Sequence, residues 1–272
     1  MESISPIFSK FSSGNGKPLS EIHRISEENK VKTYNAIPGE DDGTNIRCYD
    51  CRNKGTIAYY DEETGHIGFK DCICRGNRLT VKRLKRAGIY DSLKTKRFST
   101  FETKTPSQLA MKQSASDFVQ DDSARSIVFL GQSGCGKTHL CTAVFYELVR
   151  RRGLDGEYFL WNADGRRLKS AAIDDETGLY DKYKRCGLLY IDDLFKCGRN
   201  QWPTDADIRL AFELIDWRYS HNMYTIISSE MQFSTILEID EAIAGRIKQM
   251  AGRYLIEIAP DIQKNYRMSE VK

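Results

Sequence analysis

The sequence predicts an α/β protein with a five-stranded parallel sheet, preceded by a small cysteine-bearing domain. Three observations lead to this fold class. Downstream of Ser126, short apolar runs alternate with longer segments of helical periodicity, which is typical of a parallel sheet covered on both faces. A glycine-rich stretch directly follows the first of those runs. Four of the eight cysteines lie close together before residue 80, ahead of the alternating region.

Composition sets limits on the class of protein. A chain of 272 residues can form one sizeable core together with a small satellite domain. Mean hydropathy is -0.53, no apolar run approaches the roughly 18 residues needed to cross a bilayer, and the N-terminal stretch lacks the apolar core of a secretion signal. We therefore expect a cytoplasmic protein without membrane contact. In a reducing compartment the cysteines outside the cluster are interpreted as small buried residues.

Changes in composition along the chain predict its division into parts. The first part is polar and loop-rich. Lys and Arg then predominate between Arg75 and Lys104, either as a solvated helix face or as a surface for nucleic acid or an acidic partner. The predicted parts are a partner-binding N-terminal region (1–80) with a cysteine knob (about 44–78), a basic helical linker (81–97) and the α/β domain (98–272).

The cysteine knob is predicted to bind zinc. Two cysteine pairs flank a predicted β-hairpin with strands at 56–61 and 66–70, and these pairs are Cys48-x-x-Cys51 and Cys72-x-Cys74. A hairpin brings both pairs together, so four thiolates can form the tetrahedral cage that zinc prefers. The metal would stabilise a rigid knob that is too small to fold alone. His66 is an alternative ligand, and reduced cysteines without metal are the other interpretation.

The remaining elements follow from periodicity and from helix start and stop signals. Gly88 is expected to end a basic helix and Pro106 to open the next one. Helices are predicted at 79–89, 106–120, 138–151 and 205–220. The last of them carries an apolar stripe made of Ile208, Ala211, Phe212, Ile215 and Tyr219. Strands are predicted at 126–130, 158–162, 187–193, 224–230 and 253–258.

The glycine-rich stretch GQSGCGKTHL, residues 131–140, matches G-x-x-x-x-G-K-[ST], the phosphate-binding loop of nucleotide hydrolases and kinases. It stands between a predicted strand and a predicted helix, which is the context that this motif needs. Lys137 would reach the β- and γ-phosphates, and the Thr138 hydroxyl would hold Mg²⁺. The helix N-terminus adds its dipole. The expected ATP-binding residues are Gly131, Gln132, Ser133, Gly134, Cys135, Gly136, Lys137, Thr138 and His139.

The stretch LLYIDD supplies the second half of the predicted nucleotide site. Its apolar strand delivers Asp192 and Asp193 to the carboxyl end of the sheet, where open α/β sheets bind their ligands. Asp192 is placed to hold Mg²⁺ through water. Asp193 could polarise the attacking water as a general base.

Together these motifs resemble those of an AAA+ ATPase of the initiator clade. The stretches GQSGCGKT, LLYIDD, LIDWRY, TIISSE and AIAGRI are similar to those of the bacterial and phage helicase loaders of the DnaC/DnaI type and their relatives, the IstB-type transposition helpers. The resemblance covers about residues 98–267. The cysteine knob resembles the zinc-bearing N-terminal part of some loaders.

The resemblance implies roles for further residues. Glu230 would stand at the sensor position beside the loop strand, and Arg246 would act as an arginine finger on the ATP of the next subunit. Self-association through Arg246 follows, with Arg218 as a weaker candidate for a second interface cation. Asp193 stands where many AAA+ ATPases have Glu, which implies slow, switch-like hydrolysis. The proposed DNA contacts are Arg166, Arg167 and Lys169.

The implied function is that of an ATP-dependent loader. It would bind a replicative DNA helicase through its N-terminal part and help to place it on single-stranded DNA, with ATP, Mg²⁺ and Zn²⁺ as cofactors. A transposition helper that guides a transposase on duplex DNA is the alternative from the same clade. A small-molecule kinase with a zinc lid fits less well, because such kinases insert the lid after the loop. A nucleotide-independent adaptor is disfavoured by the intact Lys137, Thr138 and Asp192.

Overall fold

The structure, a computed structural model, describes residues 18–171, 178–198 and 201–259. The chain forms two compact units, Met1–Arg78 and Leu79–Lys272. None of the helices in the described ranges is long and apolar enough to span a bilayer.

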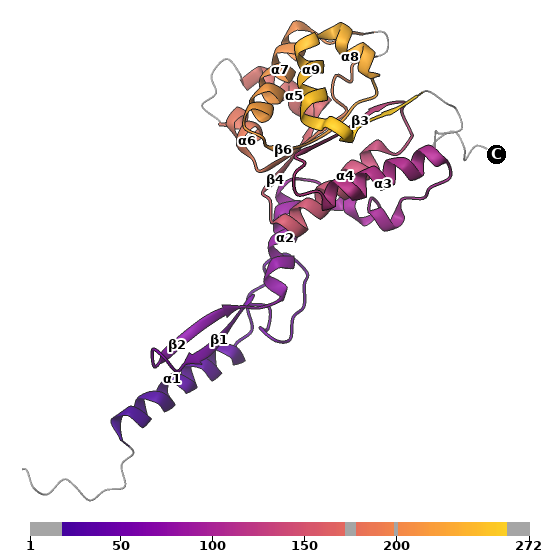
Figure 1. The fold of residues 1–272 in the computed structure, drawn as a ribbon. Helices are drawn as coiled ribbons and strands as arrows, with labels where there is room; N and C mark the ends of the chain where they lie inside the picture. The colour runs from indigo at the N-terminus through magenta and orange to yellow at the C-terminus, as the bar shows by residue number, and fades with distance from the viewer. Residues whose placement is uncertain (1–17, 172–177, 199–200, 260–272) are drawn as a thin grey trace, which may run out of the picture. The chain divides into compact units, whose positions relative to one another are not determined.

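In the first unit a helix lies along a β-hairpin (Figure 1). The elements are α1 (Leu19–Ala36), β1 (Thr56–Asp61) and β2 (His66–Asp71), and the two strands pair antiparallel. The side-chain amide of Asn35 accepts from the N–H of Ala58 (3.0 Å) and donates to its carbonyl oxygen (2.9 Å). The hydroxyls of Tyr34 and Thr56 are 2.6 Å apart. The hairpin therefore forms where the sequence predicts it, and polar side chains fasten the helix to it.

Helix α1 corrects the expectation that the region 1–80 is loop-rich. Among the residues of α1, only Glu27 is buried, so the helix carries no apolar stripe. Hydrophobic periodicity, the main signal for a helix in a sequence, is therefore absent from it. The helix packs through hydrogen bonds from polar side chains, and a binary pattern does not reveal those.

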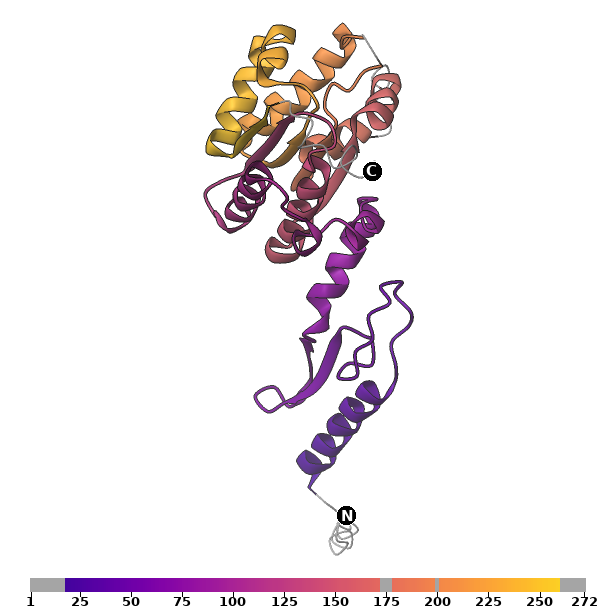
Figure 2. The same ribbon diagram turned by 90° about the vertical axis from the view of Figure 1, so that its right-hand side faces the viewer.

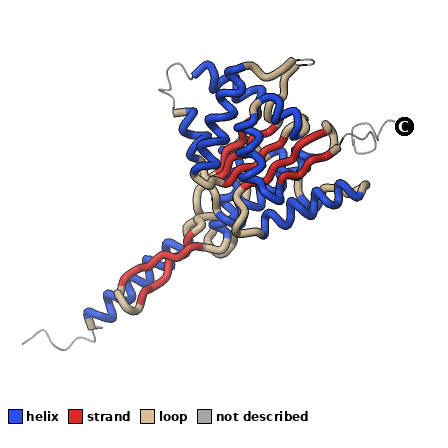
Figure 3. The backbone as a smooth tube through the Cα atoms, turned by 45° about the horizontal axis from the view of Figure 1, so that its top comes forward, coloured by secondary structure: helices blue, strands red, loops and turns tan. Residues whose placement is uncertain are grey.

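The second unit is a layered α/β structure built on one parallel sheet (Figure 3). The strand order is β4-β5-β6-β3-β7, and every neighbouring pair is parallel. The strands are β3 (Ser126–Gly131), β4 (Gly156–Leu160), β5 (Leu188–Asp192), β6 (Tyr224–Ser228) and β7 (Leu255–Ile258). The predicted fold class is confirmed. Because β6 lies between β3 and β5, its end falls between the two motifs of the predicted nucleotide site.

Helices cover both faces of the sheet (Figure 2). The described helices are α2 (Cys74–Arg86), whose residues span the unit boundary, α3 (Pro106–Gln120), α4 (Lys137–Arg152), α5 (Trp161–Ala171), α6 (Leu179–Arg185), α7 (Asp205–Ser220), α8 (Phe233–Ile239) and α9 (Glu241–Ala251). Short 3-10 turns occupy Asp91–Lys94, Phe98–Thr100 and Gly252–Tyr254.

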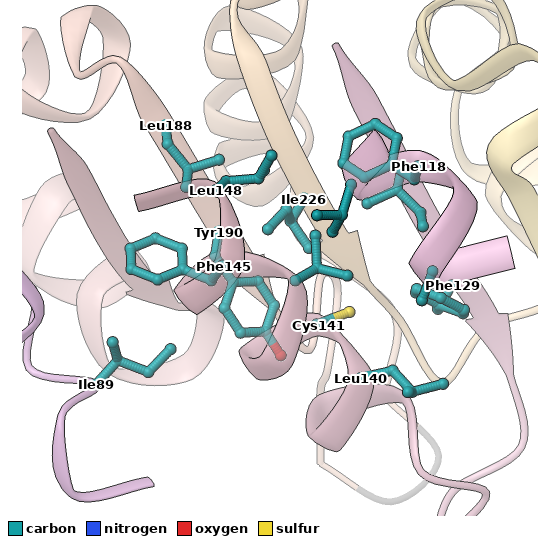
Figure 4. Close-up of a cluster of buried hydrophobic side chains, with 14 of the residues drawn as sticks. Ile89, Phe118, Phe129, Leu140, Cys141, Phe145, Leu148, Leu188, Tyr190 and Ile226 are labelled. Atoms are coloured by element: carbon teal, nitrogen blue, oxygen red, sulfur yellow. The ribbon is translucent and has the colours of Figure 1, made fainter. Parts of the chain in front are cut away.

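Successive side chains of a strand point to opposite faces of the sheet, so alternate strand residues pack in two separate cores. On β3, Phe129 faces a core shared with α3 and α4, whereas Leu130 faces a core shared with α5 to α9. Figure 4 shows the first core, in which Phe145 and Leu148 of α4 pack over the sheet. The segment 81–97, predicted as a basic linker, contributes Leu84, Ile89 and Leu93 to this core.

Two further expectations about these elements are wrong in detail. The strand predicted at 158–162 runs over Gly156–Leu160, and Trp161 already belongs to α5. The Leu160 N–H donates to the carboxylate of Asp164 (2.8 Å) instead of to a neighbouring strand, which ends the ladder there. On α7, Ala211 and Ile215 of the predicted stripe are buried in the core and Ile208 and Phe212 pack against it, but Tyr219 is exposed. The buried face also includes Leu210, Leu214 and Arg218.

The burial of Arg218 on α7 corrects the interpretation of this residue as an interface cation. Its side chain is fully buried, and its guanidinium donates to the carbonyl oxygens of Tyr183 (3.1 Å), Cys186 (3.1 Å) and Tyr224 (2.6 Å) and to the hydroxyl of Thr225 (3.0 Å). A charge can be buried at such a site because its hydrogen bonds are satisfied. Arg218 therefore holds α6, α7 and β6 together and is not an interface cation.

Candidate functional site

The glycine-rich loop joins the end of β3 to the start of α4. At Gly131, φ is +105°, and a Cβ atom would lie 2.1 Å from the carbonyl oxygen of Ile258, so this position requires glycine. Gly136 caps α4 with φ of 101°. Lys137 is buried, and its amine donates to the carbonyl oxygens of Gly131 (2.6 Å) and Gln132 (2.7 Å). The loop thus combines a lysine ammonium with a helix N-terminus, an arrangement that suits phosphate.

Asp192 is buried at the end of β5, where it collects hydroxyl donors from four elements. Its carboxylate accepts from Tyr190 (2.7 Å), Tyr158 (2.9 Å), Ser228 (2.5 Å) and Thr138 (3.3 Å). Burial, with the charge of Asp192, raises the pKa of Tyr190 far above its usual range, so this phenol remains a donor. A carboxylate beside the Thr138 hydroxyl is an oxygen pair that can hold Mg²⁺.

Asp193 and Glu230 share one lysine. The Lys196 amine lies 2.8 Å from the Asp193 carboxylate and 3.2 Å from that of Glu230. Burial acts to raise the pKa of Glu230, but a hydrogen bond from Ser133 and the charge of Lys196 outweigh it and hold this pKa below its usual value. Asp193 itself has φ of +60°, and its N–H donates to the Ser228 hydroxyl (3.0 Å). The three charged groups form an ion-paired cluster at the mouth of the site.

A cavity of about 530 Å³ lies over these groups. The predicted residues that line it are Ser133, Gly134, Gly136, Lys137, Thr138, His139, Asp192, Asp193 and Glu230. The predicted residues Gly131, Gln132 and Cys135 do not line it, and Cys135 is buried. The structure therefore brings most of the predicted ATP-binding set to one cavity.

The other wall of the cavity comes from the segment before α3. Its lining residues are Lys96, Thr100, Phe101, Glu102 and Lys104. His139 joins this wall to α4, because its Nε2 lies 2.8 Å from the Arg97 carbonyl oxygen and its ring meets Phe101 edge-on at 5.1 Å between centroids. Burial, opposed by the Arg97 hydrogen bond, lowers the pKa of His139, so the ring is neutral near pH 7 and its Nε2 can donate.

Sequence reasoning missed several of these residues. Tyr158 reaches Asp192 only because β4 pairs with β5, and Ser228 only because β6 separates β5 from β3. Tyr158 belongs to no motif, and Ser228 lies in the stretch TIISSE without a role assigned from the sequence, so strand order alone reveals their contacts with Asp192. The position of Lys196 could have been noticed in the sequence, because it lies three residues after Asp193 and is therefore near the acid pair. The wall at 96–104 had none beyond its positive charge.

The four clustered cysteines lie together in the first unit. The Sγ atoms of Cys48 and Cys72 are 3.6 Å apart, those of Cys51 and Cys74 are 3.5 Å apart, and all four lie within 4.8 Å of one another. Tetrahedral zinc with Zn–S bonds of about 2.3 Å needs Sγ atoms about 3.8 Å apart. The donor set and its spacing therefore fit zinc.

Two donors orient this cysteine cage. The N–H of Gly55 points to the Cys51 sulfur (3.2 Å), and the Arg78 Nε lies 3.4 Å from the Cys74 sulfur. Buried Arg78 also pairs with Asp42 (2.9 Å). Such outer contacts commonly position metal ligands, and a guanidinium offsets the negative charge of thiolates. His66, the alternative ligand, belongs to a different group of side chains.

Comparison with known proteins identifies the family. Residues 50–247 match the family model described as IstB-like ATP binding protein, which covers well over half of the chain. This chain belongs to the IstB-like ATP-binding family. It is therefore an ATP-binding protein, and its second unit has the AAA+ P-loop fold.

Two relatives of this IstB-like protein come from bacilli. The phage-like element PBSX protein XkdC of Bacillus subtilis (strain 168) is 28% identical over 245 residues, which cover 86% of this chain and 91% of that protein. An ATP-binding protein of insertion sequence IS232 from Bacillus thuringiensis subsp. berliner is 36% identical over 137 residues, 47% of this chain and 50% of that protein.

Solved structures also resemble the second unit. The replication initiator DnaA bound to AMPPCP and single-stranded DNA gives a TM-score of 0.50 at 20% identity and covers 62% of this chain and 51% of that one. The DnaC helicase loader gives a TM-score of 0.49 at 24% identity, with 60% and 97% covered. The DnaA likeness concerns the fold alone.

Arg246 of the IstB-like chain lies on α9, outside the cavity. Its guanidinium pairs with Asp216 of α7, packs 4.9 Å from the centroid of the Phe212 ring and remains about a third exposed. A role on a neighbouring subunit would require this ion pair to open or to be shared. The finger role of Arg246 stays a prediction.

The three predicted DNA contacts lie on α5 and differ in solvent exposure and in ion pairing. Arg166 is exposed, and Arg167 is largely exposed with Asp164 3.7 Å away. Lys169 is mostly buried and pairs with Asp207 at 2.5 Å. Arg166 and Arg167 are therefore the better placed for phosphate, whereas Lys169 joins α5 to the first turn of α7.

Replacing Lys196 with Met is expected to raise the basal rate of ATP hydrolysis about two- to fivefold. In its predicted role as the general base, Asp193 must lose its ion pair with Lys196 before it takes a proton. A part-exposed ion pair contributes about 0.2–1 kcal/mol. Steady-state phosphate release measures the change. Lys184→Met, which removes a part-buried lysine 3.7 Å from Glu213, is the control and should leave the rate unchanged. A fall in rate would instead assign Lys196 to the reaction itself.

Proposed function

We propose that this IstB-like chain is an ATP-dependent loader of a replicative DNA helicase, which binds the helicase through its N-terminal unit and single-stranded DNA through its AAA+ unit. The proposal is carried by the combination of a strand–loop–helix nucleotide site with a four-cysteine cage in a separate unit. Among the residues that the structure describes, those that line the nucleotide cavity belong to the second unit, and the proposal assigns the cage to partner binding. A rigid knob suits partner binding, and the ATP site suits a switch.

The residue roles follow from the geometry of the cavity. In the proposal Lys137 binds the β- and γ-phosphates, and Thr138 with Asp192 holds Mg²⁺, which neutralises charge on the phosphates. Asp193 takes the proton from water and Glu230 senses the terminal phosphate. The short Asp193 side chain, engaged by Lys196 at 2.8 Å, supports slow hydrolysis of the kind that a switch needs.

The test measures partner and DNA binding with and without nucleotide. Immobilised protein with ATP is expected to retain the replicative helicase of its host and to bind a fluorescent single-stranded oligonucleotide, whereas Lys137→Ala should lose the ATP-dependent part of both. Arg166→Ala with Arg167→Ala should weaken only DNA binding, because both side chains are exposed on α5. Failure to bind helicase in either nucleotide state would overturn the proposal.

A transposition helper is the second candidate. The similarity to the IS232 ATP-binding protein favours it, although that similarity covers only half of that protein's length. Such a helper should prefer duplex DNA and a transposase. A competition between duplex and single-stranded oligonucleotides, with ATP present, separates the two candidates.

Arg246→Ala is expected to bind ATP normally but to hydrolyse it poorly, with a loss of about a thousandfold if the residue acts on the neighbouring subunit. Its guanidinium contacts Asp216 and Phe212 and does not line the cavity of its own subunit, so local ATP binding should persist. Nucleotide affinity and phosphate release are measured separately.

Mixing variants tests whether Arg246 acts between subunits. Arg246→Ala and Lys137→Ala together should regain part of the activity that neither has alone, because a shared interface pairs one intact loop with one intact arginine. Asp216→Ala is the control for the ion pair inside the chain, and it should retain most activity. No recovery at concentrations where the wild type assembles would make Arg246 an ordinary surface arginine.

A further inference from the structure

We propose that the N-terminal unit carries a second metal site, separate from the cysteine cage, in which His23, Glu27 and His66 bind a divalent transition metal ion of the zinc class. Each of these residues offers a ligand atom, and the three atoms lie within 4.8 Å of one another. The sequence had pointed to His66 as an alternative ligand for the cysteines. The fold places it with a helix histidine and a buried carboxylate instead.

Two elements build the site. His23 and Glu27 are four residues apart on α1, so they lie on one face of the helix. His66 is the first residue of β2, and its Nδ1 is 4.0 Å from the Glu27 Oε2. Tetrahedral zinc with bonds of about 2.0–2.1 Å needs donor atoms about 3.4 Å apart. Small side-chain rotations therefore close the site around an ion.

Glu27 is the unusual member of the group. It is 3% exposed, and among the residues of α1 it alone is buried. Its Oε1 accepts from the Lys30 amine (2.5 Å) and its Oε2 from the Ile67 N–H (2.9 Å). These two donors fix the carboxylate in place while each oxygen keeps acceptor capacity. A rigid, buried carboxylate that faces two imidazoles is a preorganised anionic ligand.

The His23 ring is oriented by the backbone. Its Nε2 lies 3.2 Å from the carbonyl oxygen of Gly65, in the turn of the hairpin. Metal-binding histidines commonly donate their second ring nitrogen to such a carbonyl, which leaves the other nitrogen with its lone pair for the ion. The His23 and His66 rings also meet edge-on, with centroids 5.3 Å apart. In the proposed site, Nε2 of His23 donates to Gly65 and Nδ1 is the ligand atom.

The donor set selects the class of metal. Two imidazoles and one carboxylate suit zinc, cobalt and nickel, whereas Mg²⁺ and Ca²⁺ prefer oxygen ligands alone. Both histidines are exposed, so water completes the coordination. The ion would link the first turns of α1 to the turn end of the hairpin. The contacts of Tyr34 and Asn35 fasten the opposite end of the same helix.

The experiment titrates Co²⁺ into full-length protein whose cysteine cage is loaded with zinc. Wild type is expected to bind one additional Co²⁺ per chain without the thiolate-to-cobalt absorption band that a cysteine site produces. Loss of even an orienting partner costs about 10- to 100-fold in metal affinity, so His23→Ala and His66→Ala should each weaken this binding by about 100-fold or more. Glu27→Gln should weaken it as well, and bound zinc should stay unchanged in all three variants.

His221→Ala is the matched control, because His221 is an exposed histidine at the end of α7, outside the group. It should bind Co²⁺ like wild type. Hydrogen exchange at the Ile67 amide gives a second measurement and should slow when the metal is added. The proposal is overturned if wild type binds no additional ion, or if the additional ion survives in the His23→Ala, His66→Ala double variant. Either result would make the group a set of side-chain contacts between α1 and the hairpin.

Discussion

Lys137→Ala is expected to abolish ATP binding, with a loss of affinity of at least about 100-fold. The Lys137 amine lies over the loop at the base of the cavity, where it contacts the carbonyl oxygens of Gly131 and Gln132. An ammonium that donates to two phosphate oxygens contributes about 3–6 kcal/mol, and about 2.7 kcal/mol already corresponds to a factor of 100. Titration with a fluorescent ATP analogue measures the change directly.

Asp193→Asn is the matched variant for this experiment. It should retain ATP binding but reduce hydrolysis by about 100-fold or more, since an amide cannot accept the proton of the attacking water. Both positions line the same cavity, so a general disturbance of the site would affect binding in both variants alike. Equal losses of binding in proteins with unchanged melting temperatures would contradict the assigned roles.

The cysteine cage is predicted to hold zinc, and Cys72→Ser is expected to abolish zinc binding and to unfold the N-terminal unit. Structural zinc sites contribute about 10–16 kcal/mol of apparent binding free energy, which is comparable to the whole stability of a small domain. Apart from the cysteines, Ile46 and Ile57 are the described apolar residues that pack at the cage, so apolar packing there is small and the metal would contribute much of the stability. Elemental analysis of carefully purified wild type should find about one tightly held zinc per chain, and circular dichroism should report the loss of structure.

Two control variants test whether zinc binding depends on the four clustered cysteines and not on another thiol or on a histidine. Cys197→Ser removes a cysteine outside the cluster and should retain zinc. His66→Ala should also retain it, because four-cysteine coordination does not use the imidazole. ATP binding should survive in Cys72→Ser, since the nucleotide cavity is lined by the second unit. Wild type that contains no zinc would end the structural role assigned to the cage.

Much of the second unit could be predicted because its signals are local. The strand Ser126–Gly131 is a buried apolar run, the loop that follows has a fixed pattern of glycines and lysine, and α4 begins at Lys137 as its motif requires. The hairpin in the first unit was equally readable, because two short β-rich runs enclose a turn. Each of these features depends on residues within about a dozen positions of one another.

Features that depend on polar contacts between residues far apart in the chain could not be predicted from the sequence. Helix α1 carries no apolar stripe, and Arg218 sits in a core because carbonyl oxygens from other elements satisfy its guanidinium. Arg218 therefore belongs to the buried face of α7, beside the apolar stripe that the sequence predicts. A charged residue in a sequence favours exposure until its hydrogen-bond partners are known.

The sequence by itself determined the α/β fold class, the phosphate-binding loop, the acid pair and the cysteine pairs, because each is encoded by spacing along a short stretch. The tertiary structure alone decided which groups act on one another across the sheet. Strand order places Tyr158 and Ser228 on Asp192, and it brings Glu230 within reach of Lys196. In the first unit, the packing of α1 on the hairpin places His66 beside Glu27, whereas the sequence had left it as an alternative ligand with the cysteines. Spacing fixes neighbours along one element, whereas neighbours between elements depend on how the whole chain buries its apolar surface and satisfies its polar groups.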